Sequence, residues 1–193
     1  MNLVDRAKNI IMTPKTEWPV IAGESPNIGQ IMTGYVLPLA LIPAVAKIIG
    51  LAFIGGMLSV SYSLAMGVFT FAVAVLSVYL AAYIIDFLAP NFGSQKNLGR
   101  SFQFVAYSST PGWVAGALYV FPFISWVVMV ASLYGLYLLY LGLPPIMKTP
   151  QDKVVIFLVV AIIAVCVVYA VVGAILGSIF STMFGIGAFS TWY

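Results

Sequence analysis

The chain has 193 residues, of which 63% are hydrophobic and only 7% are charged. A soluble domain of ordinary composition carries about 25% charged residues, so these charges could not cover a globular surface and the bilayer is the expected solvent. The net charge of +3 is too small, and too divided by apolar runs, to indicate nucleic-acid binding. With no histidine and one cysteine, Cys166, the chain offers no metal-ligand spacing and no intramolecular disulfide, and we expect no cofactor.

Residues 1–29 are predicted to be a cytoplasmic, interfacial segment and not a signal peptide, because they lack a continuous apolar core. Apolar residues within 2–12 recur at helical spacing, which predicts an amphipathic helix that ends at Pro14. A second helix is predicted to begin with Thr16 as its N-cap. Both helices should lie in the membrane interface, with Trp18 at headgroup depth.

Five apolar runs follow, each near or above the length of about 20 residues that crosses a bilayer as a helix. We therefore predict an all-α integral membrane protein with a membrane domain over residues 30–180 and a short interfacial tail over residues 181–193. Hydroxyl side chains and Pro111 interrupt the third run. The predicted spans are residues 30–54, 62–88, 101–119, 121–147 and 154–180.

Lysine and arginine occupy every second connection between these runs. Three precede the first span, two lie between the second and third, and two lie between the fourth and fifth. The positive-inside rule then predicts a cytoplasmic N-terminus and a C-terminus on the far side of the membrane. The residues concerned are Arg6, Lys8, Lys15, Lys96, Arg100, Lys148 and Lys153.

Lys47 is the exception, because it lies within the outer half of the first span. Its four-carbon stem could carry the ammonium group to the outer interface, or the charge could belong to a pore or a ligand site. The same span contains Pro38 and Pro43, each of which removes one backbone hydrogen bond. We expect this span to be kinked and packed inside the bundle.

Polar faces on the second and third spans are expected to meet at their inner ends. Asp86 lies on a face of the second span, and Arg100 shares a face of the third span with Tyr107. Because a loop of about a dozen residues joins the spans, they should be antiparallel neighbours. Asp86 is then predicted to pair with Arg100 or Lys96, which would offset the cost of burying either charge alone. The alternative is a carboxylate at a helix end that faces water.

Pro111 removes the helical donor from the carbonyl of Tyr107 in the middle of the third span. The hydroxyls of residues 108–110 are placed to satisfy that carbonyl, and the same break could line a polar cavity. Residues 112–116 and 173–177 each form a Gly-x-x-x-Gly step, which permits close helix packing within the chain or between copies.

Several short segments follow one another in a characteristic order. They are Pro14–Ile21 (PKTEWPVI), Gly34–Pro38 (GYVLP), Ile85–Gly93 (IDFLAPNFG), Ala106–Trp113 (AYSSTPGW), Leu136–Pro144 (LYLLYLGLP) and Lys148–Lys153 (KTPQDK). In this order the segments resemble the Yip family of Ypt-interacting proteins, in its small prokaryotic form. The resemblance covers nearly the whole chain and implies five spans with a cytoplasmic N-terminus, in a bacterial inner membrane.

Eukaryotic members of that family resemble membrane-trafficking factors that bind Rab-type GTPases. They carry a long polar N-terminal segment with an Asp-Leu-Tyr-Gly-Pro signature, where this chain has Thr16-Glu17-Trp18-Pro19. The family's Gly-Tyr-Ser element also appears here as Ala106-Tyr107-Ser108. These departures argue against carrying GTPase binding over to this chain.

We expect a non-enzymatic membrane protein that acts on membrane organisation, or as an adaptor for other membrane proteins or lipids. The alternative is a small transporter or channel that uses the proline-broken first and third spans, which a cavity at the break would favour. An intramembrane enzyme is disfavoured, because the spans supply no His–carboxylate, Ser–His or acidic pair. The candidate functional positions are Lys47, Asp86, Arg100, Tyr107, Ser108 and Pro111.

Overall fold

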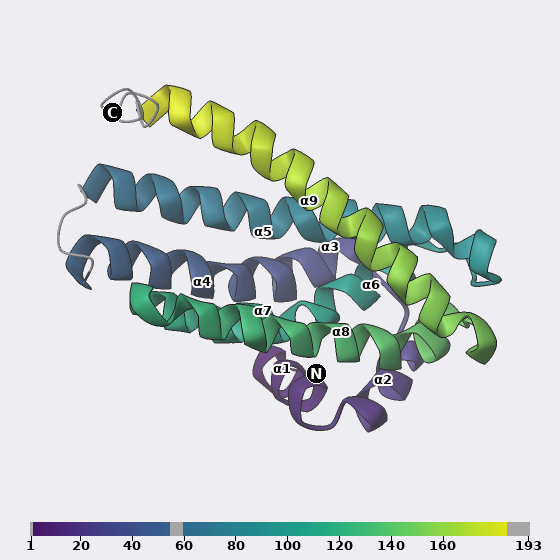
Figure 1. Ribbon diagram of the computed structural model, residues 1–193. Coiled ribbons are helices and arrows are strands. Elements are labelled where there is room, and N and C mark those ends of the chain that lie inside the picture. The colour runs from purple at the N-terminus through teal and green to yellow at the C-terminus, as the bar shows by residue number, and fades with distance from the viewer. Residues whose placement is uncertain (1, 55–59, 185–193) are drawn as a thin grey trace.

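Four helices in the described part of the chain are long and apolar enough to cross a membrane. The computed structural model describes residues 2–54 and 60–184, and every regular element within these ranges is helical. The expected all-α class is therefore confirmed. The first three of these helices run along one axis, and the last is inclined across them (Figure 1). The four candidate spans are Ile28–Ile54, Val60–Phe92, Pro122–Met147 and Gln151–Ile179.

The first span is helical throughout but is not a regular α-helix. A π-helical turn ends two residues before Pro38, which has no amide hydrogen to donate. Pro43 lies inside the following α-helix. The irregular helix geometry expected for this span is thus found as a π-helical turn beside Pro38. The pieces are α3 (Ile28–Ile31), η1 (Met32–Val36), α4 (Leu37–Ile49) and η2 (Gly50–Ile54).

The second, fourth and fifth predicted spans each correspond to one long helix. The fifth continues to Phe184, so the first residues of the predicted tail are helical, and residues 185–193 lie outside the described residues. Residues 55–59 of the predicted first loop also lie outside them. The elements are α5 (Val60–Leu88), followed by η3 (Ala89–Phe92); η5 (Pro122–Ile124) and α8 (Ser125–Met147); and η6 (Gln151–Lys153) and α9 (Val154–Phe184).

The third predicted span is broken into shorter helices at Ser109. It nevertheless extends along the whole bundle. At one end Ser101 contacts Asp86 near the end of α5, and at the other end Tyr119 lies against Gly50. A Cβ atom on Gly50 would stand only 2.3 Å from the Tyr119 carbonyl oxygen, so this contact requires glycine. The pieces are α6 (Leu98–Ser108), α7 (Thr110–Ala115) and η4 (Gly116–Val120).

The N-terminal segment forms two short helices that lie against one side of the bundle (Figure 1). The first, α1 (Leu3–Met12), ends before Thr13 as expected. The second, α2 (Pro14–Gly23), begins at Pro14 with Thr13 in the N-cap position, so the prediction of Thr16 as N-cap was wrong. Proline suits the first helical position because it has no amide hydrogen to leave unpaired and its φ is already helical.

Trp18 was predicted to lie at the depth of the lipid headgroups, but it is buried in the protein. Its side chain is 1% exposed, and its ring centroid is 5.9 Å from that of Phe104. A Cβ atom on Gly142 of α8 would lie 2.8 Å from Cε2 of Trp18, so glycine makes room for the indole. The N-terminal segment is therefore part of the protein core at this end of the bundle. Other fully buried side chains include Ile10, Ile21, Phe102, Leu138 and Phe157.

Candidate functional site

The break between α6 and α7 is held by a chain of hydroxyl groups. Pro111 cannot donate to the Tyr107 carbonyl, and the Thr110 hydroxyl donates to that oxygen instead, at 2.7 Å. Tyr35 Oη lies 2.7 Å from Thr110 Oγ1. A threonine hydroxyl has a single hydrogen, so Tyr35 donates this second bond. The expectation that a hydroxyl beside Pro111 satisfies the broken backbone is confirmed.

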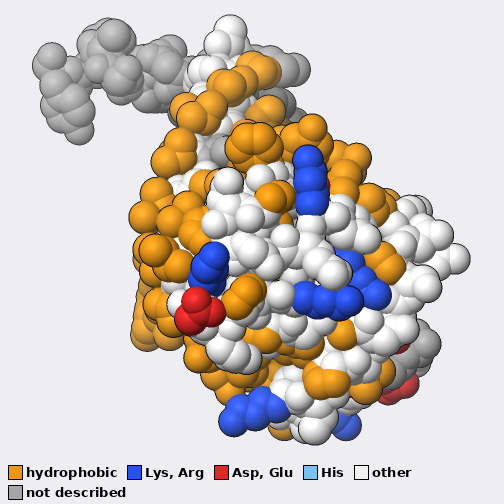
Figure 2. Space-filling view, turned by 90° about the vertical axis from the view of Figure 1, so that its right-hand side faces the viewer, with side chains coloured by type: hydrophobic (Ala, Val, Ile, Leu, Met, Phe, Trp, Pro, Cys, Tyr) orange, Lys and Arg blue, Asp and Glu red, His pale blue; other side chains and the backbone are white. Residues whose placement is uncertain are grey.

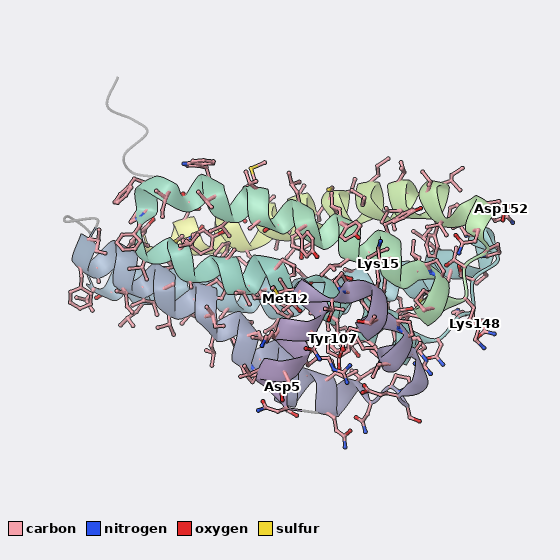
Figure 3. All side chains as sticks on the ribbon, turned by 90° about the horizontal axis from the view of Figure 1, so that it is seen from below. Asp5, Met12, Lys15, Tyr107, Lys148 and Asp152 are labelled. Atoms are coloured by element: carbon pink, nitrogen blue, oxygen red, sulfur yellow. The ribbon has the colours of Figure 1, made fainter. Side chains whose placement is uncertain are left out.

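Arg6 of α1 reaches the same region from the N-terminal segment. Arg6 is 5% exposed, and its Nη1 lies 2.6 Å from Oε1 of Glu17, which is equally buried. Its Nη2 is paired with Glu24. The guanidinium carbon also lies 5.4 Å from the ring centroid of Tyr107, within cation–π range. Tyr107 is covered by the N-terminal segment when the molecule is viewed from that side (Figure 3).

This Arg6 network was not found by reasoning from the sequence. The sequence shows Arg6 as one of three positive charges before the first span, and it indicates neither Glu17 nor Glu24 as a partner. The three residues do not belong to one continuous helix, and they meet because the turn at Thr13 brings α2 back beside α1. The one available signal was that two of the chain's five carboxylates lie between that turn and the first span.

Asp86 does not form the predicted ion pair with Arg100 or Lys96. The hydroxyl of Ser101 donates to Asp86 Oδ1, at 3.4 Å. Arg100 Nη1 instead donates to Gln103 Oε1 at 3.2 Å and to the Ile21 carbonyl at 3.4 Å. Consecutive helical residues point about 100° apart, so Ser101 faces α5 while Arg100 faces α2. Lys96 is exposed at the end of the bundle.

A cavity of about 490 Å³ lies among the long helices beside the break. It brings together Pro43 and Lys47 of the first span with Ser108 and Ser109 at the break. Ser108 is 4% exposed, and its hydroxyl has no hydrogen-bond partner among the described residues. Buried polar atoms are nearly always paired, so an orphaned hydroxyl at a cavity wall indicates a place that a polar group or water can occupy.

Lys47 contacts an aromatic ring at the cavity wall. Its Nζ lies 5.5 Å from the ring centroid of Tyr119, and no carboxylate in the described residues pairs with it.

The six candidate positions predicted from the sequence lie in three separate places in the structure. Lys47 and Ser108 line the cavity, and Tyr107 and Pro111 belong to the hydroxyl chain beside it. Asp86 of α5 and Arg100 of α6 lie apart from both, at the end of the bundle, and they contact different faces of α6.

The small residues of the third segment bring neighbouring helices close, as predicted. A Cβ atom on Gly116 would lie 2.5 Å from Cβ of Pro43, and one on Gly112 would lie 3.1 Å from Oγ of Ser132. Gly173 and Gly177 differ, because a Cβ atom at either position would meet nothing within 4 Å. The second glycine step therefore makes no close contact within the described residues.

One protein-family model matches most of the chain. The model of the Yip1 domain family matches residues 8–175. The chain belongs to the Yip1 domain family. The match contains Glu17, Lys47, Asp86, Tyr107 and Pro111, and it begins two residues after Arg6.

Two named relatives of this Yip1-domain chain are bacterial. Both are called inner membrane protein YohC, one from Escherichia coli K12 and the other from Escherichia coli O6:H1 strain CFT073. Each is 29% identical over 151 residues, which cover 72% of this chain and 77% of the relative. The expected inner-membrane location is confirmed by these relatives. No solved structure matches the chain.

Proposed function

We propose that this Yip1-domain protein crosses the membrane five times, with its N-terminus in the cytoplasm and its C-terminus on the far side. Four crossings are supported by the long apolar helices. The fifth is supported by residues 98–120, which extend from the Ser101–Asp86 contact to the Tyr119–Gly50 contact. Lysine and arginine side chains gather on one end of the bundle (Figure 2), which the positive-inside rule assigns to the cytoplasm.

We propose that the protein has no catalytic activity and acts within the bilayer, on membrane organisation or as an adaptor for lipids or other membrane proteins. The observation that supports this proposal is that buried polar groups inside the bundle are bonded to one another. Arg6 is bound to two glutamates, and Thr110 is bound to a backbone carbonyl and a tyrosine. These groups hold the fold together, and we infer that the outer surface contacts the partners.

That outer surface is suited to lipid and to other membrane helices. Exposed apolar side chains follow the length of α8 and α9, and we propose that these two helices contact lipid or a membrane partner. The open space around Gly173 and Gly177 would admit a closely packed helix, including α9 of a second copy. GTPase binding is not part of this proposal. Exposed residues on these helices include Met129, Leu133, Val155, Val159 and Ile163.

The cavity beside the break favours a second candidate function. It joins the first span at Pro43 and Lys47 to the third segment at Ser108 and Ser109, and these are the two proline-broken segments. Broken helices around a cavity at membrane depth are typical of transporters. A small transporter or channel is therefore the alternative to the adaptor.

Reconstitution into liposomes separates the two candidates. Flux of ions, of small solutes and of labelled lipid is measured in parallel, against protein-free liposomes. The adaptor proposal predicts no ion or solute flux above that control. Ion or solute flux that Lys47→Met abolishes, and that Lys8→Met leaves intact, would establish the transporter instead. Lys8 is the matched control because it is an exposed lysine on α1, away from the cavity.

A further inference from the structure

A separate hollow of about 520 Å³ lies between α2 and the C-terminal end of α8. Lys15 and Trp18 of α2 line one side, and Tyr140 and Leu141 of α8 line the other. It shares no lining residue with the cavity beside the break. Its volume falls in the range of about 300–1,000 Å³ that is usual for small-molecule sites.

Trp18, which lines this hollow, carries an unused hydrogen-bond donor. The side chain is almost fully buried, and its Nε1 has no hydrogen-bond partner within the described residues. The indole nitrogen can only donate, and a buried tryptophan usually finds an acceptor. Lys15 adds an ammonium group that forms no ion pair in the described part of the chain. Both groups would be satisfied by one anionic oxygen, such as that of a phosphate.

The facing wall carries two carbonyls that lack their usual helical donors. Pro144 and Pro145 have no amide hydrogen, so the carbonyls of Tyr140 and Leu141 lose the donors that a regular α-helix would provide. All four residues line the hollow. Such carbonyls would be satisfied by a ligand that carries several N–H groups, such as a primary ammonium. The hollow thus combines donors for a phosphate with acceptors for an amine.

The position of the hollow indicates a ligand that comes from the membrane. Along the bundle axis, Lys15 lies between Tyr107 and the charged end marked by Lys148 and Asp152 (Figure 3). That is the level at which apolar helix gives way to charged residues. From Tyr140, a stripe of exposed apolar side chains runs back along α8 at helical spacing, where acyl chains would lie. The stripe consists of Leu136, Leu133 and Met129.

We propose that this hollow binds the headgroup of a phospholipid that carries a primary ammonium, of the phosphatidylethanolamine class. Its phosphate accepts from Trp18 Nε1 and Lys15, its ammonium donates to the carbonyls freed by Pro144 and Pro145, and its acyl chains lie along Leu136 and Leu133. The proposal does not rest on the function proposed above. Lipid binding here is measured without any flux or adaptor assay.

Native mass spectrometry of the purified full-length chain tests the site. The protein is equilibrated in mixed micelles with equal amounts of three lipids that have identical acyl chains and phosphoethanolamine, phosphocholine or phosphoglycerol headgroups. We expect preferential retention of phosphatidylethanolamine. Phosphatidylcholine has the same phosphate but no N–H groups, so it should bind less. Equal retention of these two lipids, or preferential retention of phosphatidylglycerol, would overturn the proposal.

Two variants locate the binding. Trp18→Phe keeps an aromatic ring against Phe104 and Gly142 but removes the indole N–H. Lys15→Gln changes an exposed side chain that forms no ion pair within the described residues. Each should lower phosphatidylethanolamine retention about tenfold, as expected for the loss of one hydrogen bond to a charged group. The matched control, Lys8→Gln, removes a lysine outside the hollow and should retain the lipid.

The source of the phosphate is distinguished by competition with soluble molecules. Inorganic phosphate and glycerophosphoethanolamine carry the headgroup chemistry without acyl chains. If the hollow serves a lipid, millimolar amounts of either should fail to displace phosphatidylethanolamine. Displacement by them would overturn the lipid assignment, and so would unchanged retention in Trp18→Phe and Lys15→Gln variants that melt at the wild-type temperature.

Discussion

Arg6 and Glu17 form a buried ion pair, with 2.6 Å between Nη1 and Oε1, that joins the two helices of the N-terminal segment directly above Tyr107. The segment that composition describes as an interfacial anchor is thereby part of the bundle. Arg6 and Glu17 face inward, toward the break between α6 and α7.

Arg6→Met should destabilise the protein by about 3–5 kcal/mol, because it leaves Glu17 as an unpaired buried carboxylate. The double variant Arg6→Met/Glu17→Met should be more stable than Arg6→Met alone, since no orphaned charge remains. Glu24→Gln should cost less, because the Glu24 side chain is 40% exposed and Arg6 keeps Glu17. Unfolding in detergent micelles measures all three. Additive losses in the double variant would contradict the buried pair.

Gly142→Ala tests the socket that receives Trp18. The added methyl group would lie 2.8 Å from Trp18 Cε2 and 2.9 Å from Phe104 Cε2, so the indole must move. Overpacking of this kind costs about 1–3 kcal/mol. Gly173→Ala is the control, because the same methyl group meets nothing within 4 Å in α9 and should raise stability by about 0.5–1 kcal/mol. If both variants melted alike, the socket would not exist as described.

Thr110→Val should lower stability by about 1–3 kcal/mol, because it leaves the Tyr107 carbonyl and the Tyr35 hydroxyl without partners. Tyr35→Phe should cost less, since Thr110 still donates to the carbonyl. Thr70→Val is the control. Thr70 donates to the Met66 carbonyl within an unbroken helix, where the backbone amide remains as a donor. A loss at Thr70 as large as that at Thr110 would show that the break does not depend on its hydroxyls.

The corrected position of Asp86 is tested by a double-mutant cycle. Asp86→Asn keeps an oxygen that can accept from Ser101, and it removes no ion pair, so it should change stability by less than about 0.5 kcal/mol. Combined with Arg100→Gln, the effects should simply add, because the two side chains share no partner. A coupling of about 1 kcal/mol or more between them would restore the ion pair.

The features that the sequence predicted correctly depend on local rules. Pro111 removes a donor four residues back whatever surrounds it, so the need for a hydroxyl near Tyr107 followed from position alone. The long helices followed from the lengths of the apolar runs. The third segment forms three short helices, and the same local rules could have predicted this, because Pro111, Gly112 and Gly116 all weaken a continuous helix.

The features that the sequence did not predict depend on how separate elements turn toward one another. The Arg6–Glu17 pair requires the reversal at Thr13, and the sequence pattern does not show how α2 turns back on α1. Trp18 resembles an interfacial anchor until Gly142, on a distant helix, makes room for it. Asp86 and Arg100 were expected to pair because their helix ends meet. On α6 it is Ser101, one residue after Arg100, that faces Asp86, so the carboxylate contacts a hydroxyl and not the guanidinium.

The most direct test of this account is the side of the membrane reached by each end of the broken third segment. In a Cys166→Ser background, Gln95→Cys and Phe123→Cys place single cysteines at exposed positions before and after residues 98–120. A membrane-impermeant maleimide applied to intact spheroplasts should label Phe123→Cys, and should label Gln95→Cys only after permeabilisation. Labelling of both or of neither in intact spheroplasts would mean that the segment does not cross, and would contradict the five-crossing bundle.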